Sequence, residues 1–306
     1  MSALRAALAS DFLYYFRRDP VAIGSFTVVL LLVLIAASAP LLAPQDPYDP
    51  MQLSIMDSEL PPFWMEGADP RFLLGTDAQG RGILSTIMYG TGISLVIGIF
   101  GVLLQAFLGV TIGLTAGYLG GKLDAFLMRV ADIQLSLTTL MVAIITLAVF
   151  QAAFGTEAYE KTALLMIVIV IGIAEWPKYA RTVRASVLAE RSKEYVDAAR
   201  IIGLGRARIM VRHVLPNTMS PILVISTVQV AEAIMIEASL SFLGLGMPVN
   251  KPSLGSLIRS GFEYIFSGSW WITLFPAIVL ILLILTINLL GDWLRDVLNP
   301  RLYKGP

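Results

Sequence analysis

Two glutamates, Glu232 and Glu237, interrupt an apolar run at residues 219–243. A run of this length can cross a lipid bilayer, where a carboxylate is costly and serves a purpose. It can line a pathway or gate, or it can accept hydrogen bonds from a neighbouring helix or lie near the membrane surface. Their spacing corresponds to about 140° around a helix, so the two side chains cannot share one narrow stripe. Both interpretations stay open, and neither makes the two glutamates a catalytic pair.

Other groups that could do chemistry are scarce. The sequence has no cysteine and one histidine, His213, which excludes disulfides, thiolate chemistry and a multi-histidine metal site. We expect His213 to be structural, and we expect no metal. The chain lacks a Gly-x-x-x-x-Gly-Lys-Ser/Thr loop that would cradle nucleotide phosphates. Its net charge of zero gives no global basic field for nucleic acid.

The elements that position these residues are predicted to be membrane helices. Of the 306 residues, 57% are apolar and 14% are charged, whereas soluble domains have about 45–50% and about 25%. Apolar runs that cross about 30 Å of hydrocarbon need about 20 residues. We therefore predict an all-α membrane protein with six transmembrane helices, in runs at residues 21–42, 93–118, 133–154, 162–174, 219–243 and 270–290.

The first run could also be a cleaved signal. Ala37-Ser38-Ala39 resembles a signal-peptidase site, and Arg17 and Arg18 precede the run. The apolar core of a cleavable signal has only about 7–15 residues, however, and this run is longer. We interpret it as an uncleaved first helix.

Basic residues indicate the orientation. With the N-terminus and the C-terminus in the cytoplasm, 17 of the 22 lysines and arginines fall in inside segments, among them Arg5, Arg301 and Lys304. Such a bias is typical of cytoplasmic loops. The predicted parts are an N-terminal segment with the first helix (residues 1–45), an outer loop (46–89), a five-helix core (90–292) and a cytoplasmic tail (293–306).

The outer segment, residues 44–88, is rich in acids and prolines, which argues for an extended loop. It is either a platform on the outer surface, where an extracytoplasmic protein docks, or a partly disordered tether.

The inner loop at residues 192–217 is predicted to contain a short amphipathic helix. Ser192 can cap it, and Glu194 and Asp197 lie in its first turns, where the helix dipole favours acids. Gly203 or Gly205 can end it in the left-handed conformation. One apolar stripe is expected to contain Tyr195, Ala198, Ala199 and Ile202. Such a small-residue face can lie against a partner protein, although a helix on the lipid surface is the alternative.

Glycines recur on one face of the second predicted helix, at Gly109, Gly113 and Gly117. This spacing is suited to close packing of two helices, and a hinge is the alternative.

The inner loop resembles the "EAA" loop of ABC importer permeases. That pattern has an acid and two alanines, then glycine, then a hydrophobic position followed by Leu-Pro. Asp197-Ala198-Ala199, Gly203 and Leu215-Pro216 fall at its spacing. Asp197 replaces the usual glutamate, and His213 stands where isoleucine is usual. The amino-acid sequence of the loop is similar to that of the C-type permeases of the dipeptide/oligopeptide branch.

Further segments resemble the same branch in the same order. They are residues 74–81 before the second helix, 237–246 at the end of the fifth and 288–296 near the C-terminus. Gly82 and Leu254 depart from the pattern, which usually has aspartate and tryptophan there. The resemblance covers nearly the whole chain.

The resemblance implies an ABC type I importer permease fold in a bacterial cytoplasmic (inner) membrane. It implies a non-catalytic subunit without a cofactor of its own, because ATP and Mg would be bound by two ABC ATPase subunits. A paralogous permease would complete the pathway as a heterodimer, and an extracytoplasmic solute-binding protein would deliver the solute. The residues that would couple to the ATPases are Glu194, Asp197, Ala198, Ala199, Gly203, Leu215 and Pro216.

Peptides are the solute that this resemblance favours. Relatives of the branch also carry glutathione, nickel chelates, opines or sugars. The rival functions are an ion-coupled secondary transporter, for which the two membrane glutamates are weak support, and a membrane enzyme. Co-purification of ATPase subunits would separate an ABC permease from both.

Overall fold

The computed structural model describes residues 14–298. The predicted N-terminal segment before residue 14 and the tail beyond residue 298, with Arg5, Arg301 and Lys304, lie outside the described residues. The elements within residues 14–298 are helical, with one isolated bridge between Thr76 and Gly82. They are α2 (Pro20–Ala37), α3 (Ala39–Leu42), η1 (Pro50–Gln52), η2 (Ile55–Asp57), α4 (Ile83–Leu119), α5 (Gly121–Ser136), α6 (Thr139–Phe154), α7 (Thr156–Glu190), α8 (Glu194–Ile201), α9 (Arg206–Ile209), η3 (Met210–Val214), η4 (Leu215–Thr218), α10 (Met219–Phe242), α11 (Leu254–Phe262) and α12 (Trp271–Leu298).

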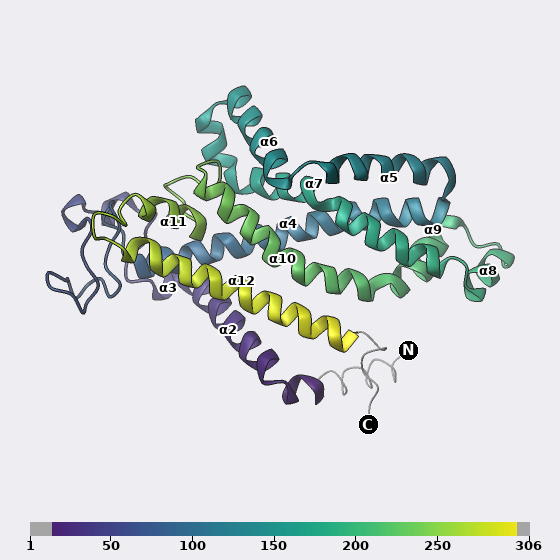
Figure 1. Cartoon of the computed structure of the whole chain (residues 1–306), viewed down its shortest axis with the longest axis horizontal. Coiled ribbons are helices and arrows are strands. Elements are labelled where there is room, and N and C mark those ends of the chain that lie inside the picture. Colours follow the sequence, from purple (N-terminus) through teal and green to yellow (C-terminus); the bar gives the residue numbers. More distant parts are fainter. Residues whose placement is uncertain (1–13, 299–306) are drawn as a thin grey trace.

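The helices form an elongated bundle along one long axis (Figure 1). The elements α8 and α9 lie at one end, and residues 44–82, α3 and α11 lie at the other. Five described helices are long and apolar enough to cross a membrane, and a sixth span is possible if α5 and α6 together form one. Successive spans run in opposite directions, so the all-α prediction with six crossings agrees with this arrangement.

The predicted third helix at residues 133–154 was wrong in its bounds. The chain bends by 89° between α5 and α6. Leu137 and Thr138 adopt extended backbone angles there, and the Ser136 hydroxyl donates to the Ile133 carbonyl. This local bond offers the backbone an alternative to continuing the helix. The apolar run therefore begins inside α5 and continues, after the bend, in α6.

Two other spans differ from prediction. The first run divides into α2 and α3 at Ser38, two residues before Pro40, which has no amide hydrogen to continue the helix. Asp19 caps the start of α2 by accepting from the Val21 and Ala22 amides. The fourth span is much longer than residues 162–174, since α7 has 35 residues. Its second half carries Lys178, Arg181 and Arg184, which the orientation count included in the inside segments.

Helices α4 and α7 pack with their backbones close together. A Cβ atom on Gly109 would lie 2.3 Å from Tyr179 Cβ, and one on Gly113 would lie 2.4 Å from the Ala180 carbonyl oxygen. At Gly117 it would lie 2.9 Å from Val187 Cβ. These distances leave no room for any side chain, so packing is the role of the three glycines.

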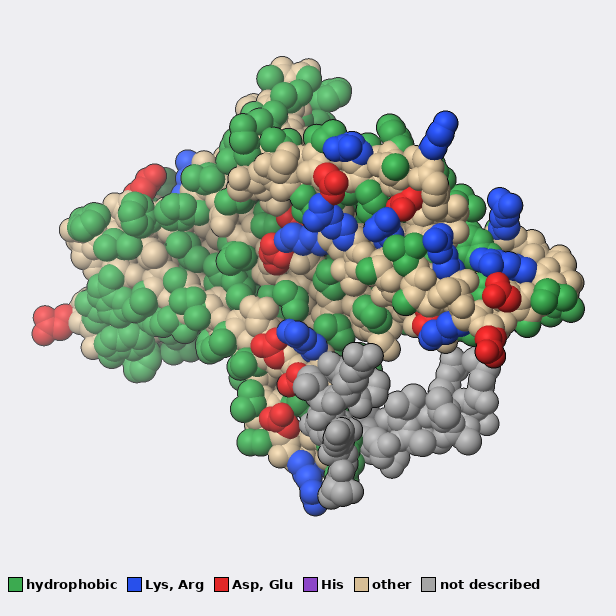
Figure 2. All heavy atoms as spheres, turned by 45° about the vertical axis from the view of Figure 1, so that its right-hand side comes forward, with side chains coloured by type: hydrophobic (Ala, Val, Ile, Leu, Met, Phe, Trp, Pro, Cys, Tyr) green, Lys and Arg blue, Asp and Glu red, His purple; other side chains and the backbone are tan. Residues whose placement is uncertain are grey.

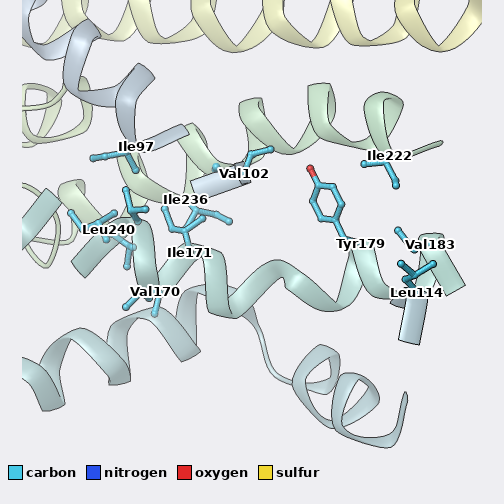
Figure 3. Close-up of a cluster of buried hydrophobic side chains, with 14 of the residues drawn as sticks. Ile97, Val102, Leu114, Val170, Ile171, Tyr179, Val183, Ile222, Ile236 and Leu240 are labelled. Atoms are coloured by element: carbon cyan, nitrogen blue, oxygen red, sulfur yellow. The ribbon is translucent and has the colours of Figure 1, made fainter. Parts of the chain in front are cut away.

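The main apolar core lies between α4, α7 and α10 (Figure 3). Ile97, Ile171 and Leu240 from these three helices are fully buried in it. The Tyr179 ring points from α7 toward α10, where its hydroxyl donates to the Ser226 hydroxyl at 3.0 Å. The core thus joins one helix from each third of the chain.

The segment predicted as the outer loop is folded onto the end of the bundle opposite α8. Asp77 and Arg81 form a buried ion pair at 2.6 Å. The Arg81 guanidinium also donates to the Val249 carbonyl, and Trp271 Nε1 donates to the Thr76 carbonyl. The Gln45 side chain accepts from the Gly82 amide. The segment is therefore tied to the bundle through Thr76 and Arg81, while Met51, Ile55 and Met56 remain exposed.

We expect Gly113→Ala to destabilise the protein and Gly92→Ala to leave it unchanged or slightly more stable. The Gly113 methyl group would meet a backbone carbonyl that cannot rotate away, whereas at Gly92 the nearest atom is 3.7 Å away. Overpacking costs about 1–3 kcal/mol, and Ala favours a helix over Gly by about 1 kcal/mol. Thermal unfolding of the two purified variants in detergent measures the difference. Equal melting temperatures would contradict the close α4–α7 contact.

Candidate coupling loop and membrane carboxylates

Helix α8 stands at the end of the bundle, between the end of α7 and the start of α10 (Figure 1). Its N-cap is Lys193 rather than Ser192, because the Ser192 hydroxyl donates to the Ala189 carbonyl at 3.2 Å instead. The helix ends as predicted, with Gly203 at a φ of 79°. The Leu204 amide bonds back to the Ala199 carbonyl at 3.1 Å, which satisfies an end carbonyl of the helix.

The predicted apolar stripe does not form a single surface. Val196 and Ala199 are buried against Ile209 and Val214 of the chain's own core. Ala198 faces outward, and Ile202 is 75% exposed. Ala199 therefore lies on the face of α8 that packs against the core, and Ala198 lies on the exposed face.

The remaining predicted coupling residues divide in the same way. Glu194, Asp197 and Gly203 are exposed. The loop continues through a π-turn, η3, into η4, where Leu215 is half-buried and Pro216 is exposed. The exposed side of α8 thus carries Glu194, Asp197 and Ala198, together with Ile201 and with Arg200, which pairs with Asp197 at 2.9 Å.

Tyr195 ties α8 to both neighbouring spans. Its hydroxyl donates to Glu190 Oε2 at 2.7 Å and accepts from the Asn217 side-chain amide at 3.1 Å. Asn217 also donates to the His213 carbonyl at 2.7 Å, so it is the backbone of His213 that takes part. Burial, followed by the bond to Glu190, raises the pKa of Tyr195. The phenol therefore stays protonated and keeps its role as a donor.

Basic side chains gather on the half of the molecule that carries α8 (Figure 2). Several of them fix α5 and α4 to α7: Arg184 pairs with Asp124 at 2.5 Å, Arg181 pairs with Asp132, and Arg191 donates to the Gly117 carbonyl at 2.8 Å. Part of the basic content of this end thus holds the bundle together.

Glu237 is buried in a network of serines. Ser94 of α4 donates to its Oε2 at 3.0 Å, and Ser241 donates to its Oε1 at 2.6 Å. Ser241 in turn accepts from the Met247 amide and the Ser253 hydroxyl. The carboxylate joins α10 to α4 and to the loop before α11. This geometry supports the structural interpretation of Glu237.

Glu232 belongs to a second cluster, which sequence reasoning missed. Lys178 of α7 lies 2.5 Å from Glu232 and 2.6 Å from Glu175. Glu175 is only 1% exposed, and it also accepts from Thr139 and Gln229. Gln229 donates to Gln105 of α4 at 3.3 Å. Four helices therefore meet in one polar cluster, which holds two carboxylates and one ammonium group.

A signal for this cluster was present in the sequence. Glu175 directly follows the apolar run at residues 162–174, and Lys178 lies three positions further on, which places both on one helix face. Recognising it required extending that helix beyond the run. Among residues 14–298 no group of three potential ligands could hold a metal ion.

With this geometry in view, the comparisons with known proteins decide the family. Residues 109–304 match the family described as binding-protein-dependent transport system inner membrane component. The chain belongs to this family. Residues 8–62 match the N-terminal transmembrane domain of oligopeptide transport permease C.

Curated relatives align over nearly their whole length. The chain is 35% identical to the dipeptide transport system permease protein DppC of Haemophilus influenzae, covering 95% of this chain and 94% of that protein. It is 36% identical to the di/tripeptide transport system permease protein DppC of Pseudomonas aeruginosa, covering 99% of each. The solved structure of an inward-facing MetNI methionine ABC transporter has a TM-score of 0.56 at 17% identity, covering 70% of this chain and 96% of that one.

The permease predictions are confirmed. This chain is a membrane-embedded, non-catalytic permease subunit of an ATP-driven ABC importer, in a multi-pass inner membrane fold of type I. Such importers work with separate ATPase subunits and a solute-binding protein. The secondary-transporter and enzyme interpretations are thereby set aside.

We expect Lys178→Met to impair stability more than Lys161→Met. Without Lys178, Glu175 and Glu232 lose their shared cation inside the bundle, which costs about 2–3 kcal/mol. Lys161 pairs with Glu157 at the surface, with 73% of its side chain exposed, and such pairs contribute at most about 1 kcal/mol. The yield of folded protein on size-exclusion chromatography, with its melting temperature, measures both variants. A Lys178→Met protein as stable as Lys161→Met would contradict the role of the cluster.

Proposed function

We propose that this chain imports short peptides as one half of a heterodimeric pathway. The observation that carries the proposal is the alignment with relatives named for dipeptide and di/tripeptide transport over at least 93% of their lengths. A paralogous permease forms the other half, because two ATPases that close on ATP need two docking helices. Two ATPase subunits bind the ATP and Mg, since this chain has no P-loop of its own.

We propose further that α8 is the docking helix for one ATPase. Its exposed face combines Glu194, Asp197 and Ala198, and an alanine allows a close approach of another backbone. Gly203 ends the helix, and Leu215 and Pro216 connect the loop to α10. Ala199 acts from behind, by packing α8 onto the core. The ATPase pushes on α8, and the spans then rock as units between inward-open and outward-open states.

We place the α8 end of the bundle in the cytoplasm and the outer segment on the other side. The gathering of basic side chains around α8 supports this orientation (Figure 2). The outer segment then contributes to the platform where the binding protein docks, and Met51, Ile55 and Met56 are its highly exposed apolar residues.

The orientation can be tested with single cysteines, because the natural chain has none. In cells that express this chain without the ATPase subunits, we expect a membrane-impermeant maleimide to label Met56→Cys in spheroplasts and to label Ala198→Cys only after the membrane is opened. Both side chains are exposed, so access to the reagent decides the outcome. The opposite pattern would contradict the proposed orientation.

Coupling is tested by Ala198→Arg, with Ala125→Arg as the matched control. Both alanines are exposed and helical, but Ala125 lies on α5, away from the docking face. In proteoliposomes containing both permeases, both ATPases and the binding protein, we expect Ala198→Arg to abolish ATP-dependent uptake of labelled Ala-Ala and to lose ATPase subunits on purification. Added volume at a packed contact costs about 1–3 kcal/mol. Normal uptake by Ala198→Arg would contradict the docking role.

The same assay tests the substrate. Uptake of Ala-Ala by the wild-type transporter, competed by tripeptides and not by methionine, a nickel chelate or an oligosaccharide, is the expected result. Transport of one of those other solutes in place of peptides would contradict the peptide assignment while leaving the permease function intact.

A further inference from the structure

A cavity of about 400 Å³, lined by both apolar and charged side chains, opens at the end of the bundle opposite α8. It lies where the turn of the outer segment meets α11 and the loop that follows α10. Cavities that hold small ligands have volumes of about 300–1,000 Å³. The cavity contains charged groups of both signs: Asp77, Arg81, Arg259 and Glu263.

Two of these charges already neutralise each other. Asp77 and Arg81 are buried at 2.6 Å, and the Arg81 guanidinium also bonds the Val249 carbonyl. Arg259 and Glu263 are different, because both are exposed and neither has an ion-pair partner within residues 14–298. The cavity therefore offers one available cation and one available anion.

The position of Arg259 is set by the backbone around it. Gly244 has a φ of 84°, and a Cβ atom there would lie 1.7 Å from the Arg259 Nη1 atom. Glycine thus lets the guanidinium lie directly on the loop. A second cavity of about 380 Å³ shares Met247, Val249 and Arg259 with the first, so Arg259 faces both.

The spacing of the two charges fits a small zwitterion. Glu263 follows Arg259 by four positions and keeps helical backbone angles, so their Cβ atoms lie about 6 Å apart on one face. An extended dipeptide spans about 7 Å. A guanidinium binds a carboxylate through two parallel hydrogen bonds, and a carboxylate binds an ammonium group.

We propose that this cavity is an entry site for the zwitterionic ends of a short peptide. Arg259 binds the peptide carboxylate, and Glu263 binds its terminal ammonium group. The site receives the peptide when the binding protein releases it at the outer face. This inference rests on the proposed peptide function.

The test measures binding by the assembled transporter in nanodiscs, with both permeases and both ATPases but without the binding protein. The probes are Ala-Ala, N-acetyl-Ala-Ala and Ala-Ala-amide, whose binding is followed by saturation-transfer NMR. The variants are Arg259→Gln and Glu263→Gln. The control is Lys251→Gln, which removes an exposed cation that does not line this cavity.

We expect each cavity variant to raise the Kd for Ala-Ala by about three- to tenfold, as loss of one partly exposed charged contact does. Lys251→Gln leaves it unchanged. The blocked peptides give a second measurement on the unaltered protein. N-acetyl-Ala-Ala binds more weakly to the wild type, and Glu263→Gln weakens it no further, because the two changes remove the same contact.

Three results would overturn the inference. One is saturable Ala-Ala binding that neither variant weakens. Another is peptide uptake in proteoliposomes with no saturable binding without the binding protein, which leaves the proposed function standing. The third is normal Ala-Ala binding by the variants with a loss of stimulation by the binding protein, which assigns the two charges to protein docking. A transporter that imports another solute and no peptide removes the proposed function itself.

Discussion

The contact between α4 and α7 is the constraint on which the other features depend. Three glycines on α4 let the two backbones approach until a methyl group would no longer fit. Because α4 and α7 run side by side over most of their lengths, this contact fixes where the polar residues of α7 lie. It brings Glu175 near Gln105. It also places the end of α7, which α8 follows in the chain, beside the end of α4. Within a bilayer there is no hydrophobic driving force between helices, and glycines favour helix association there because they allow two backbones to approach closely.

Glu175, Glu232 and Glu237 each have a hydrogen-bond or ion-pair partner on another helix. Glu237 accepts from two serines, and Glu175 shares Lys178 with Glu232. Glu175 and Glu237 are fully buried, so either group would be costly if it were left unpaired. Since the two clusters join α10 to α4 and to α7 respectively, the three core helices are connected by polar bonds at two levels.

The sequence predicted the features that depend on local pattern. The apolar runs, the glycine face and the helix that ends at Gly203 follow from spacing and composition. The bend at Leu137 and Thr138 did not, because the hydroxyl residues around it are too weak a signal by themselves and α5 is held to α7 by ion pairs from a distant part of the chain. The sequence could not predict that Ala199 is buried and Ala198 exposed, since this depends on where Ile209 and Val214 lie. Glu175 and Lys178 were visible as residues, but their partners on α10 were not.

The phenol of Tyr195 has a mechanical consequence. It bonds to Glu190, the last residue of α7, and to Asn217, two residues before α10 begins. One hydroxyl group therefore bridges the two ends of the long connection between these oppositely directed spans. A displacement of α8 would therefore act through this one side chain on the ends of both spans.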